Sequence, residues 1–160
     1  MWAQAGQSGY VHQFQFAGDT TIHSLDEDIT KLVGKSGEIV LQLTVDQPEN
    51  SYVFFDNYFA SPELLAELHK RKLHATCTMR ANRTRDCPLL CTKDIKKKGR
   101  GAYDFRMAMD ESVLICEWYD NKVVLVASNV HSVEPTHDVR RYDGKAKKHI
   151  SVPCPGLIKS

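Results

Sequence analysis

The residue best placed to do chemistry is Asp56, a single acid directly after the apolar run in "SYVFFDNYFASPELLAEL". Residues 51–55 predict a fully buried strand of the kind found in α/β folds. A carboxylate at the carboxyl end of such a strand points into the crevice where these folds bind ligands. The alternative is an Asx-type turn made by Asp56 and Asn57, and the residues alone favour that turn. One carboxylate cannot hold two Mg²⁺ ions, which takes several carboxylates from different strands.

The cysteines and histidines offer little further chemistry. Cys77, Cys87 and Cys91 contain one loose C-x3-C spacing and no second pair, so buried or incidental thiols are favoured over a zinc site. Five cysteines, an odd number, argue against a disulfide scaffold and for a reducing compartment, cytosol or nucleus. The seven histidines have no metal-ligand spacing. Neither a glycine-rich phosphate loop nor a G-x-S-x-G elbow is present.

A basic block is concealed by the net charge of +1. Residues 69–100 contain 11 Lys and Arg against two acids, Asp86 and Asp94, and the block closes on "KKKGRG". Blocks of this kind commonly contact phosphate, which makes Lys96, Lys97, Lys98 and Arg100 candidate DNA-binding residues. A solvated surface with a linker is an equally weighted interpretation.

The elements around Asp56 follow from periodicity and capping. Residues 10–16 alternate as a half-buried strand does, residues 20–30 are typical of a loop, and residues 35–45 suit a helix or a strand equally. Ser61 and Pro62 begin a helix predicted over 62–72, and "HATCTMRAN" predicts a strand over 74–82. Strand, helix and strand around Asp56 form a βαβ-like unit.

The second half of the chain has another character. Residues 83–101 are basic and loop-like, and three strands then follow in "AYDFRMAM", "VLICEWYD" and "KVVLVASNV", with hairpin turns at 110–111 and 120–121. Residues 134–149 suggest a polar, basic loop, and "VPCPG" a return segment. The fold class predicted is α/β, with an antiparallel, β-rich meander inserted into or appended to the core. The 160 residues suit one ordinary domain, and no apolar run approaches a membrane span.

Four stretches resemble piggyBac-type transposases and the host proteins derived from them: "YVFFDNYFASPELLAELHKRKLHATCTMRANR", "KKKGRGAYDF", "EWYDNKVVLVASN" and "VRRYDGKAKK". The resemblance implies an RNase H-like core that cuts and joins DNA with Mg²⁺ held by three aspartates, interrupted by a β-rich insertion domain. On this chain it implies a partial core over 1–82, the basic loop and insertion domain over 83–150, and a return segment over 151–160.

The resemblance also assigns residues. Asp56 corresponds to the second aspartate and so to an ancestral Mg²⁺ ligand, and Arg80 and Arg83 would face DNA. Ala5 stands where the first aspartate is expected, and the chain ends before the segment that would carry the third. We therefore expect no bound Mg²⁺ and no DNA cleavage by this chain. The expected partner is DNA, either transposon ends or host DNA, and the expected location is the nucleus. We expect no contact with a membrane, and a homodimer is compatible with the resemblance. A domesticated, non-catalytic DNA-binding or protein-interaction domain is the alternative.

Overall fold

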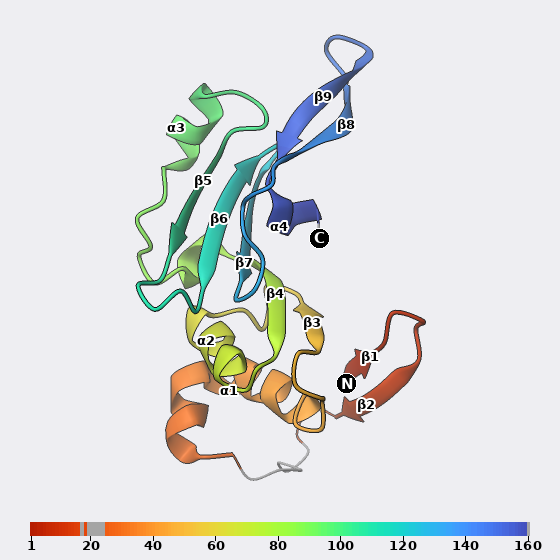
Figure 1. The fold of residues 1–160 in the computed structure, drawn as a ribbon, viewed down its shortest axis with the longest axis vertical. Coiled ribbons are helices and arrows are strands. Elements are labelled where there is room, and N and C mark those ends of the chain that lie inside the picture. Colours follow the sequence, from red (N-terminus) through yellow and green to blue (C-terminus); the bar gives the residue numbers. More distant parts are fainter. Residues whose placement is uncertain (17, 19–24, 160) are drawn as a thin grey trace.

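The computed structural model describes residues 1–16, 18 and 25–159 and shows a mixed α/β fold (Figure 1). Its main sheet has five strands in the order β3-β4-β7-β6-β5. Strands β3 and β4 are parallel, and every other neighbouring pair is antiparallel. The strands are β3 (Tyr52–Phe55), β4 (His74–Met79), β5 (Tyr103–Met107), β6 (Leu114–Tyr119) and β7 (Val123–Ser128).

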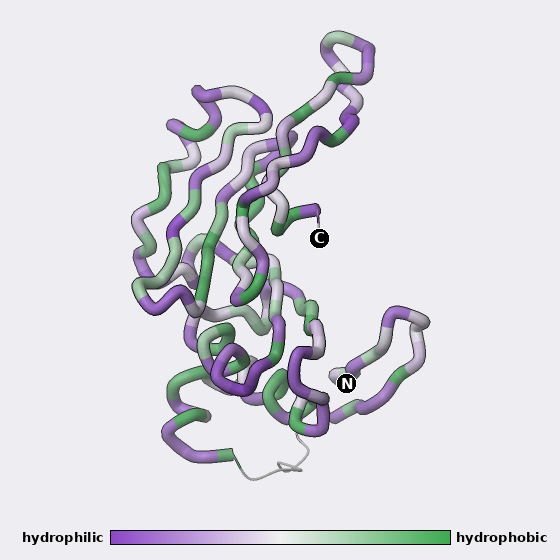
Figure 2. The backbone as a smooth tube through the Cα atoms, in the orientation of Figure 1, coloured by the Kyte–Doolittle hydropathy of each residue, from purple (hydrophilic) through white to green (hydrophobic). Residues whose placement is uncertain are grey.

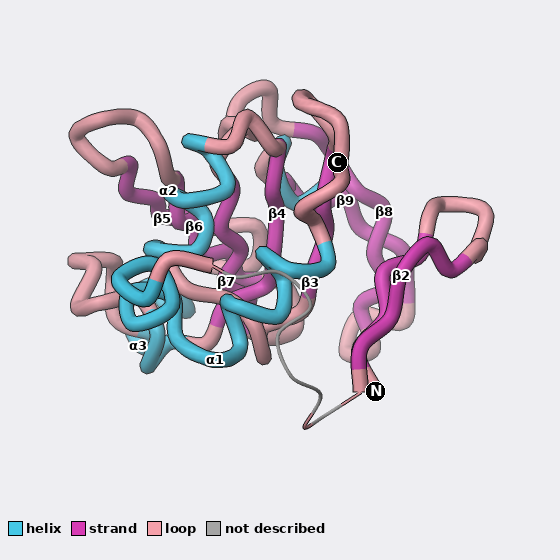
Figure 3. Tube along the Cα trace, turned by 90° about the horizontal axis from the view of Figure 1, so that it is seen from below, coloured by secondary structure: helices cyan, strands magenta, loops and turns pink. Residues whose placement is uncertain are grey.

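Two separate antiparallel hairpins flank this sheet. The first joins β1 (Trp2–Ala5) to β2 (Val11–Gln15), and the second joins β8 (His137–Asp143) to β9 (Lys148–Cys154). Figures 1 and 3 place the first hairpin on the β3 side of the molecule, apart from the main sheet. The second is attached to β6, since the Trp118 indole Nε1 donates a hydrogen bond to the Pro153 carbonyl at 2.8 Å.

The helices are short apart from α1 (Glu27–Leu43), which is interrupted at Gly34, where φ is 73° and ψ is 170°. Helix α2 (Pro62–Lys70) begins where Ser61 Oγ accepts a hydrogen bond from Leu64 N at 3.1 Å. Figure 2 shows polar and apolar residues mixed along α1 and α2, as an amphipathic helix requires. The remaining helices are the 3-10 helix η1 (Ala81–Arg83), α3 (Thr92–Lys97) and α4 (Gly156–Lys159).

Apolar side chains cover both faces of the sheet. On one face, Leu64, Leu65 and Leu68 of α2 are fully buried against strands β4, β6 and β7 and against α1. On the other face, Trp118 and Cys116 pack beneath the β8–β9 hairpin and α4. Strand β6 alternates between the two sets, which explains why nearly all of its residues are buried.

Most of the predicted elements are confirmed. Strand β2 lies within 10–16, α2 within 62–72 and β4 within 74–82, and the hairpin turns fall at 110–111 and 120–121. The choice left open at 35–45 resolves as a helix over most of its length. All five cysteines are free, and none of the helices described is long and apolar enough to cross a membrane.

Four sequence predictions are wrong. Residues 27–30 belong to α1 rather than to a loop, while residues 20–24 of that predicted loop lie outside the described residues. Residues 92–97 form α3 within the loop predicted over 83–101. Residues 134–149, also predicted as a loop, contain β8 and the start of β9. Strand β3 is not fully buried, because it is an edge strand with Tyr52 and Phe54 exposed.

The predicted boundary at residue 82 is crossed by the main sheet. Strand β4, from the predicted core, pairs directly with β7, from the predicted insertion domain, through Thr76 and Ser128 among others. The Thr76 and Ser128 hydroxyls lie 2.9 Å apart and share a hydrogen bond. Strands from both predicted units therefore form one sheet, and the division into domains stays a prediction.

Candidate functional site

Asp56 forms the turn that leads from β3 to α2. Its Oδ1 accepts a hydrogen bond from Tyr58 N at 2.6 Å, and its backbone carbonyl accepts one from Phe59 N at 3.2 Å. This is the Asx-type turn that the residues alone favoured. The Asp56 side chain is nonetheless exposed. Its carboxylate is therefore accessible to solvent at the carboxyl end of β3, as the sequence predicted.

Arg80 and Arg83 both donate to the segment after Asp56. Arg80 Nε donates to Asn57 Oδ1 at 2.7 Å. Arg83 Nη1 donates to the carbonyls of Tyr58 at 2.8 Å and Ala60 at 3.3 Å. The two arginines follow β4, which is parallel to β3, so both strands direct these residues to one edge of the sheet. The structure therefore brings Arg80, Arg83 and the Asp56 turn together, and it gives the arginines a structural role there.

The other predicted basic residues lie on and just after α3, which packs on the sheet through Ile95 and is seen beside β5 in Figure 1. Lys97 pairs with Asp94 at 2.9 Å on the same helix, and this contact with Lys97 is the main cause lowering the pKa of the Asp94 carboxyl. Lys96 and Lys98 are exposed and form no ion pair with the described residues.

Arg100 has a different environment from the lysines. Its side chain is only 19% exposed, and its Nε donates to Asp120 Oδ1. Asp120 also accepts from Arg141 Nε at 3.0 Å. Arg100 thus stabilises the junction between the main sheet and the β8–β9 hairpin, which leaves Lys96 and Lys98 as the freer positive charges of the predicted set.

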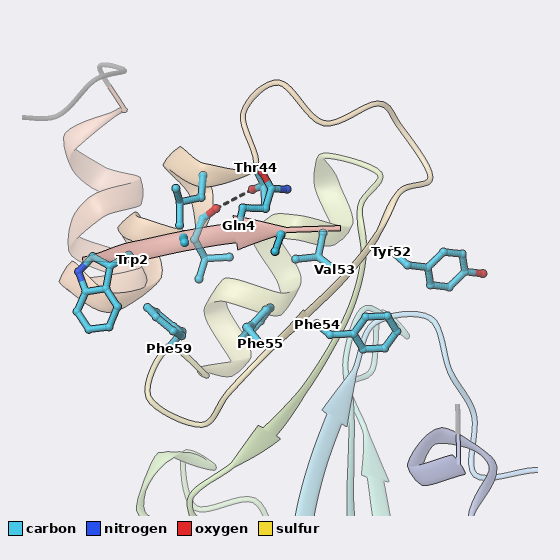
Figure 4. Close-up of a pocket in the computed structure, with 12 residues that line it drawn as sticks. Trp2, Gln4, Thr44, Tyr52, Val53, Phe54, Phe55 and Phe59 are labelled. Atoms are coloured by element: carbon cyan, nitrogen blue, oxygen red, sulfur yellow. Dashed lines mark hydrogen bonds between the residues drawn. The ribbon is translucent and has the colours of Figure 1, made fainter. Parts of the chain in front are cut away.

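Ala5 lies away from Asp56 in the structure. The Trp2 ring stacks on Tyr58 with centroids 5.2 Å apart, just after the end of β3. Gln4 Oε1 accepts a hydrogen bond from Gln47 Nε2, just before the start of β3. Strand β1 therefore runs opposite to β3, and Figure 4 shows Trp2 near Phe59 and Gln4 nearer to Val53. Position 5, one residue beyond Gln4, lies toward the start of β3 rather than beside Asp56.

Strands β1 and β3 are separated by a cavity of about 150 Å³ and form no ladder with each other. Its lining is mainly apolar and includes Trp2, Leu43, Val53, Phe55 and Phe59 (Figure 4). Proteins usually hold Mg²⁺ through one or two carboxylates together with water or phosphate oxygens, and this lining supplies no carboxylate. Across the described part of the chain, no three His, Cys, Asp or Glu side chains are grouped closely enough to bind a metal ion. The Mg²⁺ that the resemblance implies does not fit the residues of this arrangement.

Two buried polar residues were missed at the sequence level. Asn129 accepts from Ala75 N at 2.7 Å and donates to the carbonyls of Leu65 and Leu73, so it joins β7 to β4 and α2. Glu117 lies opposite Asp104 in the β5–β6 ladder and is buried. No sequence signal separates these residues from ordinary turn and strand residues, because only strand pairing buries them.

Comparison with known proteins shows the family to which this chain is related. The family model described as Transposase IS4 matches residues 1–159. The chain is 31% identical over 163 residues to human PiggyBac transposable element-derived protein 2, and 34% identical over 162 residues to human PiggyBac transposable element-derived protein 3. These alignments cover 99% of this chain but only 27% and 26% of the two relatives.

A solved structure shares the fold. The piggyBac transposase in a synaptic complex with hairpin DNA matches with a TM-score of 0.52 and 19% identity, over 78% of this chain and 24% of that one. The chain belongs to the family of piggyBac-type transposases and piggyBac transposable element-derived proteins. It spans about a quarter of the length of these curated relatives.

Proposed function

We propose that this chain binds DNA through the basic residues of segment 69–100, in the nucleus, and does not itself cleave DNA. The observation that carries the proposal is the free positive charge on α3. Lys93, Lys96 and Lys98 are exposed and form no ion pair within the described residues. Unpaired lysines on and just after one short helix are well suited to contact phosphates. The similar transposase was solved in a complex with hairpin DNA, which supports the same kind of partner.

The absence of cleavage is proposed from the residues at positions 5 and 56. Alanine at position 5 supplies no metal ligand, and β1 directs that position toward the opposite end of β3 from Asp56. A two-metal mechanism needs several convergent carboxylates. Binding of phosphates by lysines needs no metal ion, so we expect DNA binding to persist in EDTA.

Fluorescence anisotropy with a labelled duplex tests the proposal. We expect the logarithm of the affinity to fall linearly with the logarithm of the salt concentration. The Lys96→Ala/Lys98→Ala variant is expected to bind more weakly and to lower that salt slope by roughly 2, since each phosphate contact contributes about 1. Lys31→Ala/Lys35→Ala on α1 removes the same charge elsewhere and should change neither quantity.

Two results would contradict the proposal. Undetectable binding at low salt would remove DNA as the partner. Nicking of the duplex that requires Mg²⁺ and is lost in Asp56→Asn would show that the chain is catalytic after all. An Arg80→Ala/Arg83→Ala variant reports on DNA contact only if its melting temperature is unchanged, because both arginines also hold the turn after Asp56.

A further inference from the structure

A second cavity of about 300 Å³ lies between segment 81–92 and the face of the main sheet. Glu117 of β6 and Leu125 of β7 contribute its floor, and the segment above contributes Cys87, Leu89, Leu90 and Cys91. This volume is at the lower end of the range for small-molecule sites. The lining combines apolar side chains with the hydroxyls of Thr84 and Thr92 and a single carboxylate. A few polar groups in a mainly apolar pocket are the usual means of orienting a ligand.

The Glu117 carboxylate is buried without a partner. The residue is 4% exposed, and its Oε2 accepts no hydrogen bond from any described residue. Buried polar atoms are nearly always hydrogen-bonded, and an unpaired one is costly. An unsatisfied acceptor in the floor of a cavity is therefore a position at which a ligand donor would be stabilised.

The surrounding charges leave Glu117 without a cation. Asp104, directly opposite in the ladder, has partners of its own: its Oδ1 accepts from Arg106 Nη1 at 2.7 Å, and its Oδ2 accepts from Leu90 N at 2.9 Å. Two acids at paired positions of one ladder repel each other unless a positive group compensates them. Burial, and secondarily the Asp104 charge, raise the pKa of the Glu117 carboxyl.

We propose that this cavity binds a small organic cation, a guanidinium or a protonated amine that carries a short apolar group. Its N–H groups donate to the Glu117 carboxylate, and its apolar group packs against Leu89, Leu90 and Leu125. An anion is disfavoured by the two acids. A metal ion is disfavoured because the carboxylates and thiols in the described residues do not converge on one point. None of the lysines of α3 lines this cavity, so cation binding can be measured without DNA and is tested apart from the proposed DNA contact.

The two cysteines of the lining provide a readout that does not depend on any activity. Cys91 is exposed and Cys87 partly exposed, whereas Cys77, Cys116 and Cys154 are buried. Alkylation by iodoacetamide is followed at each cysteine by mass spectrometry. We expect butylguanidinium to slow alkylation of Cys87 several-fold in a saturable manner. Butylurea, which has nearly the same shape and no charge, should give no protection.

The matched variants are Glu117→Gln, which removes the charge with little change of shape, and Glu111→Gln on the exposed β5–β6 turn. Protection by butylguanidinium should be at least about tenfold weaker in Glu117→Gln, since a hydrogen bond to a charged acceptor is stronger than one to a neutral amide. Protection should be unchanged in Glu111→Gln. N-acetyl-arginine amide, used in a parallel arm, shows whether an arginine side chain or only a free guanidinium is accepted.

Three results would overturn the proposal: equal protection by butylurea, no protection by either guanidinium compound, or full protection retained in Glu117→Gln. If Glu117→Gln does not fold, the comparison of butylguanidinium with butylurea on the unsubstituted chain decides the question by itself.

Discussion

At the scale of single residues, Asp56 shows how one carboxylate can be structural at a position that also suits catalysis. Its Oδ1 holds Tyr58 N at 2.6 Å, and Arg80 and Arg83 hold the residues that follow. The order of residues predicted both the exposed acid and the turn. It could not predict that the two arginines donate to this turn, because that contact depends on how β4 lies beside β3.

The turn role of Asp56 predicts different costs for two substitutions. Asp56→Asn keeps an oxygen acceptor and should stay within about 0.5 kcal/mol of the unsubstituted free energy of unfolding. Asp56→Ala removes the acceptor and should cost about 1 kcal/mol. Urea denaturation measures both, with Asp138→Ala on an exposed strand residue as control. Equal losses in the two Asp56 variants would argue against the turn role.

The buried carboxyl of Glu117 predicts a pH dependence of stability. Its folded-state pKa is raised above the ordinary value near 4.5, chiefly by burial. A raised pKa favours the protonated carboxyl in the folded chain. The stability that this carboxyl contributes is therefore fully present below its ordinary pKa and is lost as the pH rises through its raised, folded-state pKa.

Glu117→Gln does not titrate and gives the comparison. We expect the free energy of unfolding of the variant, relative to the unsubstituted chain, to increase between pH 4 and pH 7. Urea denaturation at several pH values measures this difference. A difference in the free energy of unfolding that stays constant over that range would mean that burial does not raise the pKa of Glu117.

At the scale of elements, sequence patterns were most informative where local rules decide the structure. Ser61 and Pro62 fixed the start of α2 because a cap and a first-turn proline act within one helical turn. Strand β8 was missed because His137–Asp143 is largely polar. Because the hairpin packs one face on the sheet and exposes the other, its buried and exposed residues alternate. The adjacent arginines Arg140 and Arg141 obscured this alternation of apolar and polar residues in the sequence. The edge position of β3 was also unpredictable, because it depends on which strand pairs with β4.

The close approach of β9 to the segment before β5 predicts a sensitive glycine. A Cβ at Gly101, whose φ is 93°, would lie 2.6 Å from Pro153 Cδ. We expect Gly101→Ala to cost about 1–3 kcal/mol through the clash and the backbone strain. Gly144→Ala in the β8–β9 turn is the control, since a Cβ there meets nothing within 4 Å and should be tolerated. Thermal melts of the two variants should separate clearly, and similar melting temperatures would contradict this packing.

At the scale of the whole molecule, the sheet depends on residues far apart in the chain. Thr76 and Ser128, the hydrogen-bonded pair between β4 and β7, are 52 positions apart. Closing a loop of that length costs entropy before any strand pairing repays it. On a ribosome, α1 and α2 would emerge while the strands that cover their apolar sides are still unsynthesised. Chaperones would therefore have the longest access to apolar surface while only the first half of this chain has been synthesised. The main sheet could form only after β7 has left the exit tunnel.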